Sequence, residues 1–165
     1  MANLKFLYKY SGQTIEQLLS LESEYRIDSL VEVFEQAVNK KIARDGESAI
    51  SAEERVILAV EGLEREVNNG GYSLFFENST REFVPIIVQA LGRIGCSKTA
   101  EITQRAIDSL HLPTLGVEAI DAVLTNGEFS EEELNECDRL YYQGAENISG
   151  QLFAFIKTNK NAIAF

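Results

Sequence analysis

The chain has little of the residues on which most catalytic and metal sites depend. Among its 165 residues are one histidine, two cysteines, two prolines and no tryptophan. A Ser-His-Asp, Cys-His or multi-histidine metal site would have to include His111, which lies in "DSLHLP" at an expected helix end. A cation or a backbone partner is favourable at such a position. We therefore expect no enzymatic activity, no catalytic residue, no metal and no cofactor.

The scarce cysteines and the absence of long apolar runs bear on the compartment. Cys96 and Cys137 match no metal-binding or redox spacing, which is typical of free thiols in a reducing compartment. No stretch approaches the ~20 apolar residues that cross a bilayer. The opening "MANLKFLYKYSG" lacks the apolar region of a signal peptide. These features predict a soluble, cytoplasmic protein.

Basic residues are also scarce. The sequence has 15 Lys and Arg against 26 Asp and Glu, a formal net charge of −11. Nucleic-acid phosphates and anionic membranes would both repel this charge, so we expect neither as a direct partner. The charge favours a basic partner instead, although solubility alone is a simpler reason for an acidic composition.

Apolar residues recur at helical spacing along most of the chain. The clearest stripes are Leu30, Phe34, Ala37, Val38 and Ile42, then Val56, Val60, Leu63 and Val67, then Phe83, Ile87, Ala90, Leu91 and Ile94. Turn signals separate the stripes at 45–46, 69–71, 95, 113–116 and 126–127. We predict one compact all-α domain over residues 1–165, with neighbouring helices antiparallel because the connections are short.

Helix starts can also be predicted. Ser51 with Glu54 and Ser130 with Glu133 have the spacing of capping boxes. We expect Ser97 to cap a helix that begins near Lys98. A further helix should begin near Phe83, which places Pro85 in its first turn, where proline is tolerated.

The segment "EREVNNGGYSLFFENST", residues 64–80, has the composition of either a catalytic loop or a helix corner. Asparagine and glycine tolerate the left-handed conformation that ends many helices. Tyr72, Phe75 and Phe76 then fall on one helical face, which is typical of core residues. A catalytic Ser73 would have only Glu77 nearby and no histidine, which makes a weak nucleophile. We interpret the segment as a structural corner.

This corner also carries a resemblance. The run "EVNNGGYSLFFENS", followed by "FVPIIVQALGRIGCSKTAEI", resembles the signature of a bacterial family of small helical proteins whose characterised member is a DNA mimic. By motif the resemblance covers roughly residues 50–110. It implies an all-α fold, a homodimer and no known enzymatic activity. For the DNA mimic it implies an acidic surface that occupies the DNA-binding site of a helix-turn-helix transcription regulator.

Mimicry requires carboxylates in stripes, because duplex DNA presents about one charge per 3.4 Å of each strand. Between residues 118 and 138 there are eight acidic residues and no lysine or arginine. From this run we take as candidate partner-binding residues Glu118, Asp121, Glu128, Glu131, Glu132 and Glu136. A second expected patch consists of Glu54, Glu61 and Glu64. Carboxylates in a first helical turn also complement the macrodipole without any partner.

Three functions remain open from the sequence. The first is a DNA mimic that blocks a transcription regulator, whose binding should weaken steeply with salt. The second is a carboxylate-site enzyme such as a hydrolase, which should have buried acids in a cleft. The third is an acidic scaffold protein. A calcium loop is disfavoured, because "NGEFSEEE" would place Ala122 and Leu124 where oxygen ligands are required.

Overall fold

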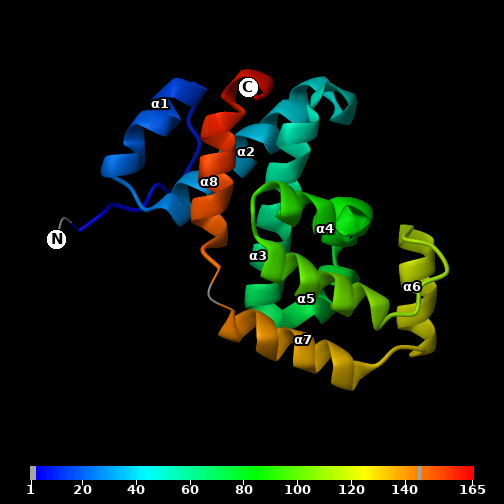
Figure 1. Cartoon of the computed structure of the whole chain (residues 1–165). Helices are drawn as coiled ribbons and strands as arrows, with labels where there is room; N and C mark the ends of the chain where they lie inside the picture. Colours follow the sequence, from blue (N-terminus) through cyan, green and yellow to red (C-terminus); the bar gives the residue numbers. More distant parts are fainter. Residues whose placement is uncertain (1–2, 145) are drawn as a thin grey trace. The chain divides into compact units, whose positions relative to one another are not determined.

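The computed structural model describes residues 3–144 and 146–165, and these residues form an all-helical fold (Figure 1). They contain eight α-helices and no strand, which confirms the predicted fold class. Among the described residues, Lys5 and Tyr25 form an isolated parallel β-bridge. No helix in the described part of the chain is both long and apolar enough to cross a membrane.

The chain divides into two compact units. The first unit is Met1–Glu61 with Asn147–Phe165, and the second unit is Gly62–Glu146. One domain over the whole chain stays a prediction. Short 3-10 turns lie between the helices, at η1 (Leu21–Ser23), η2 (Glu47–Ala49), η3 (Ser79–Phe83) and η4 (Lys160–Ala162).

The first unit contains α1 (Ile15–Ser20), α2 (Ile27–Asp45), the start of α3 (Ala52–Glu77) and α8 (Ile148–Thr158). Helices α2 and α8 lie side by side (Figure 1). Leu30, Phe34 and Val38 of α2 are fully buried, which confirms this part of the predicted stripe. The ring of Phe34 meets that of Phe153 from α8 edge-on at 6.5 Å between centroids. Aromatic and aliphatic side chains of α2 and α8 therefore form this core.

The second unit contains the rest of α3, then α4 (Val84–Arg93), α5 (Ser97–Asp108), α6 (Val117–Asn126) and α7 (Glu131–Gln143). Helix α5 contacts both α4 and α7. Pro85 lies in the first turn of α4, as predicted, where its missing N–H leaves no hydrogen bond unmade. Helix α6 ends at Asn126, and Gly127 follows in the left-handed conformation.

The caps were predicted with mixed success. The Ser51–Glu54 box is complete, because Ser51 N donates to Glu54 and Glu54 N donates to Ser51 Oγ at 3.0 Å. The Ser130 hydroxyl accepts from Glu133 N at 3.2 Å, but the Glu133 side chain turns to an arginine instead of closing the box. The prediction for Ser97 is wrong, since Ser97 is already the first residue of α5 and the N-cap position is occupied by Cys96.

Glu146 caps α5 in place of the expected serine. Its carboxylate accepts hydrogen bonds from Lys98 N, Thr99 N and the Thr99 hydroxyl, at 3.1, 2.8 and 2.7 Å. Partial burial raises the pKa of Glu146, but the hydrogen bonds from Thr99 and Lys98 outweigh it and hold the pKa below its ordinary value. A carboxylate at a helix N-terminus also complements the macrodipole.

Candidate functional site

The corner of α3 is built around two glycines in the second unit. Helix α3 is interrupted at Gly70 and Gly71. Gly71 has φ +80° and ψ −174°, a conformation that is essentially restricted to glycine. A Cβ atom at Gly71 would lie 2.6 Å from Cγ of Asp138, a residue of α7. The Asp138 carboxylate accepts a hydrogen bond from Tyr72 N at 2.7 Å, so it caps the second half of α3.

Aromatic residues after the corner fill the core of the second unit. Tyr72, Phe75 and Phe76 are fully buried, which confirms the structural interpretation of this segment. The Tyr72 hydroxyl pairs with the Thr103 hydroxyl at 2.8 Å. Burial raises the pKa of Tyr72 far above its ordinary value, so this phenol stays protonated. The signature residues thus form a helix corner and its core.

The prediction that Glu54, Glu61 and Glu64 form a second exposed patch is wrong. Glu54 is 0% exposed and Glu61 is 6% exposed. Glu54 accepts two hydrogen bonds from Lys41 Nζ, each at 2.9 Å, and one from Ala164 N at 2.8 Å. Every residue from 56 to 63 is buried, so α3 is surrounded by protein and has no wide polar face here. The assumption of one narrow apolar stripe therefore failed.

Glu64, the third member of that patch, is half-buried in the second unit and accepts a hydrogen bond from the Tyr141 hydroxyl. Burial raises the pKa of Glu64, against the opposing effect of the Tyr141 hydrogen bond. Glu64 therefore serves a side-chain pair between α3 and α7 and presents little charge to solvent.

The first expected patch lies on α6, α7 and the loop between them. Glu118 and Asp121 belong to α6, Glu128 to the loop, and the others to α7. Glu136 is half-buried. The other five side chains are exposed: Glu118, Asp121, Glu128, Glu131 and Glu132. The second unit thus carries all six acids that the sequence analysis took from the run.

Arginines reach this surface from outside the run. Arg81 of η3 pairs with Asp121 at 2.6 Å, Arg105 of α5 pairs with Glu133 at 2.6 Å, and Arg139 follows directly after the run. Hydrogen bonds from Arg105 lower the pKa of Glu133. A run of sequence without lysine or arginine is therefore not isolated from cations in space.

A charged hollow marks the place where these arginines meet α7. It has a volume of about 550 Å³ and is lined by Arg105, Glu132, Glu133, Asn135, Glu136 and Arg139. Arg139 pairs with Glu136 at 2.5 Å, and hydrogen bonds from Arg139 lower the pKa of Glu136. This part of α7 carries alternating charges. Glu132 lines the hollow as well but makes no ion pair with either arginine among the described residues.

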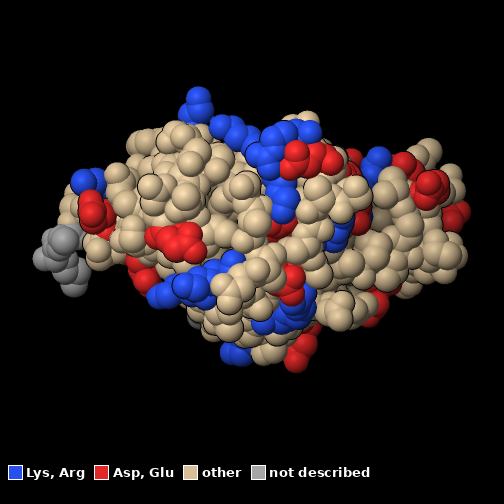
Figure 2. Space-filling model, turned by 90° about the horizontal axis from the view of Figure 1, so that it is seen from above, with Lys and Arg blue, Asp and Glu red and all other residues tan. Residues whose placement is uncertain are grey.

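Four of the six acids keep an uncompensated charge. Glu118, Glu128, Glu131 and Glu132 make no ion pair within residues 3–144 and 146–165. In the first unit, by contrast, Glu22 pairs with a lysine at 2.7 Å. Figure 2 shows one face of the molecule, on which clusters of basic side chains stand beside acidic ones. The strongest candidate anionic site is therefore formed by Glu128, Glu131 and Glu132 at the α6–α7 turn, together with Glu118 in the first turn of α6.

Nucleophilic chemistry has little support among the described residues. Cys96 and Cys137 are free and buried. Burial raises the pKa of Cys96 to about 11, and burial also raises the pKa of Cys137. His111 is exposed and has φ +50°. In the part of the chain that the structure covers, no group of three or more His, Cys, Asp or Glu side chains could hold a metal ion.

The chain is similar to a known protein family. The model of the DMP19-like protein family matches residues 48–159, which include α3 to α8. No curated protein matches, and no solved structure matches. The matched segment covers more than half of the chain and contains both the glycine corner and the α6–α7 acids. The chain therefore belongs to the DMP19-like protein family.

Proposed function

We propose that this protein is a DNA mimic that binds a helix-turn-helix transcription regulator through an acidic surface and blocks its binding to DNA. Membership of the DMP19-like family supports the proposal, since DMP19 is a DNA-mimic protein family. The observation that carries it beyond the family is the group of uncompensated carboxylates Glu118, Glu128, Glu131 and Glu132. We call this group the acidic turn.

The acidic turn carries exposed negative charge, which supports binding to a basic surface. Glu118 lies in the first turn of α6, Glu128 in the α6–α7 loop, and Glu131 and Glu132 in the first turn of α7. The four carboxylates thus come from three segments of the second unit and do not form the single stripe expected from the sequence. Exposed charges are individually weak, which makes the expected effect collective. A basic partner would be attracted over about a Debye length and released by salt.

The ion-paired acids should contribute less. Asp121 and Glu136 already have arginine partners within the second unit, so a regulator would have to compete with those arginines. We therefore centre the proposed contact on the acidic turn and place Asp121 and Glu136 at its margin. Glu54, Glu61 and Glu64 have no part in it, because the first two are buried and the third is bound to a tyrosine.

We further propose that the protein acts by binding and not by catalysis, and that it forms a homodimer as the family resemblance implies. The acids that a hydrolase would need in a cleft have structural partners instead. Glu64 accepts from Tyr141, and Asp138 caps α3 at Tyr72. Each of these carboxylates is accounted for by the packing of the second unit.

The test has two steps. The protein is immobilised, exposed to a cell extract at low salt, and eluted with a salt gradient to identify the captured DNA-binding protein. The captured regulator is then combined with its operator in a gel-shift competition. One variant replaces Glu118, Glu128, Glu131 and Glu132 by Gln. The control variant replaces four other exposed acids by Gln, at Glu16, Glu47, Glu77 and Glu101, which likewise make no ion pair among the described residues.

The two variants change the net charge equally, so they separate a local surface from general acidity. The wild type and the control should displace the operator from the regulator at similar concentrations. The acidic-turn variant should need a concentration at least about tenfold higher. Equal competition by all three proteins would refute the acidic turn as the contact. If both variants lose competition equally, the binding depends on the net charge of the protein and not on the acidic turn.

A further inference from the structure

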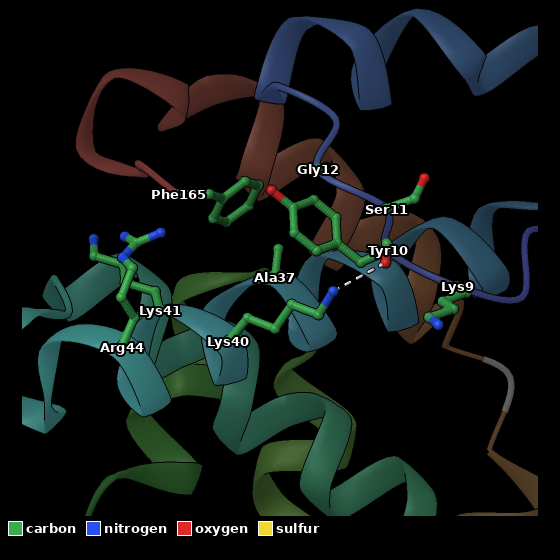
Figure 3. A pocket seen from close by; sticks show the side chains of 9 residues that line it. All are labelled: Lys9, Tyr10, Ser11, Gly12, Ala37, Lys40, Lys41, Arg44 and Phe165. Atoms are coloured by element: carbon green, nitrogen blue, oxygen red, sulfur yellow. Dashed lines mark hydrogen bonds between the residues drawn. The ribbon is translucent and has the colours of Figure 1, made fainter.

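The first unit contains a basic pocket in an otherwise acidic protein (Figure 3). Its volume is about 490 Å³, within the usual range of small-molecule sites. It is lined by Lys9, Tyr10, Ser11, Gly12, Ala37, Lys40, Lys41, Arg44 and Phe165. Four of these residues have cationic side chains and none has an acidic side chain, although acidic residues outnumber basic ones in the chain by 26 to 15.

Helix α2 supplies most of the positive charge. Ala37, Lys40, Lys41 and Arg44 follow the spacing i, i+3, i+4 and i+7, so they share one face of the helix. The C-terminal end of a helix attracts cations, which gives Arg44 a structural reason to be there. That reason does not apply to Lys9, which reaches the same hollow from the N-terminal segment.

The cations of the pocket differ in how far they are neutralised. Lys41 is committed to the buried Glu54. Arg44 donates three hydrogen bonds to Asp45, at 2.6–3.0 Å, so an incoming anion would have to displace Asp45 or share the guanidinium with it. Solvent screens this pair, in which the Arg44 side chain is 60% exposed. Lys40 donates to the carbonyl oxygen of Tyr10 at 3.3 Å, which leaves its charge uncompensated. The pocket therefore retains positive charge.

One wall of the pocket is aromatic. The rings of Tyr10 and Phe165 meet edge-on with their centroids 5.8 Å apart. In Figure 3 they lie above the α2 side chains, with Lys41 and Arg44 pointing toward the Phe165 side and Lys40 beneath the Tyr10 ring. Lys40 Nζ is 5.1 Å from the centroid of Tyr10. A molecule in the pocket would thus meet ring surface and cationic groups together.

We propose that this pocket binds a small organic anion in which a phosphate or carboxylate group is joined to an aromatic or apolar ring. Arg44 and Lys40 hold the anionic group, and Tyr10 and Phe165 contact the ring. The rim stays open at Gly12, where a Cβ atom would have nothing within 4 Å. The site belongs to the first unit and is independent of the acidic turn in the second.

The test is an NMR titration of the full-length protein with phenyl phosphate, benzoate, inorganic phosphate and phenol. Phenyl phosphate or benzoate should cause saturable shifts of the amides of residues 9–12, of Phe165 and of the last turns of α2. Comparison of these two probes assigns the anionic group. Inorganic phosphate lacks the ring and phenol lacks the charge at neutral pH, so each should bind several-fold more weakly.

Two charge-matched variants complete the test. Arg44→Gln should weaken binding of the better probe about tenfold, because it removes a charge-assisted contact. Lys160→Gln removes an equal charge from an exposed lysine of η4 and should leave binding unchanged. Both side chains are exposed, so both variants should fold, as amide spectra will show. Absence of saturable shifts, equal binding of phenol, or equal weakening by the two variants would overturn the proposal.

Discussion

Replacement of Gly71 by alanine tests the central structural feature of the corner. The substitution adds one methyl group at φ +80° and ψ −174°, where residues with a side chain are strained. The new Cβ would lie 2.6 Å from Cγ of Asp138. Asp138 cannot withdraw without losing its hydrogen bond to Tyr72 N. The variant thus disturbs the backbone and the cap together.

The magnitude follows from these two effects. A non-glycine residue in such a backbone conformation costs about 1–3 kcal/mol. Loss of a hydrogen bond to a charged group costs about 1.5–3 kcal/mol. We expect Gly71→Ala to lower the free energy of unfolding by roughly 3–5 kcal/mol, a large part of the ~5–15 kcal/mol typical of a domain. Urea unfolding followed by circular dichroism measures this difference.

Gly92 provides the matched control. It lies within α4, its φ is not positive, and a Cβ there would have nothing within 4 Å. Gly92→Ala should therefore stabilise the protein by about 0.4–1 kcal/mol, because alanine restricts the unfolded chain. The same chemical change should thus act with opposite sign at the two glycines.

A double-mutant cycle separates backbone strain from the clash. In an Asp138→Ala background the carboxylate is absent, so Gly71→Ala should cost only the backbone part, about 1–3 kcal/mol. Additive effects of the two substitutions would contradict the close approach of Asp138. A cost below about 1 kcal/mol for Gly71→Ala alone would refute the reasoning about the corner.

Three further substitutions concern buried or capping charges. Glu146→Gln should destabilise the protein by about 1 kcal/mol at neutral pH; because the folded pKa of Glu146 is lowered, the wild type loses this advantage as pH falls through that pKa, which pH-dependent urea unfolding can measure. Glu64→Gln should show the opposite trend: the folded pKa of Glu64 is raised, so the wild type gains stability relative to the variant as pH falls through it. Lys41→Met leaves the buried Glu54 without its cation and should cost about 3 kcal/mol by thermal unfolding.

Much of the fold could be predicted from local signals. Breaks at Gly46, Gly71, Gly95 and Gly127 correspond to positive φ angles, because glycine adopts them without a steric penalty. The position of Pro85 fixed the start of α4 for an equally local reason. Such predictions depend on the residue and its neighbours in sequence, and tertiary contacts do not alter them.

Other features depend on residues far apart in the chain. Glu146 caps α5 across 47 residues, which no local pattern around Ser97 indicates. The burial of Glu54 follows from its Lys41 partner and from the contact with Ala164. Some signal was present, since α3 has an unbroken run of five apolar residues at 56–60, which is typical of a helix buried on most sides.

The candidate acidic surface shows why a charge pattern in sequence is an incomplete guide to an electrostatic surface. The run from 118 to 138 predicts a local excess of carboxylates, and the excess is present. Its field, however, depends on the cations that folding brings near, and Arg81 and Arg105 come from η3 and α5. Because those arginines pair with Asp121 and Glu133, the acids that keep an unpaired charge are those of the acidic turn. A partner that reads charge should therefore distinguish Glu128 and Glu131 from Glu133, although all three lie within six residues of one another.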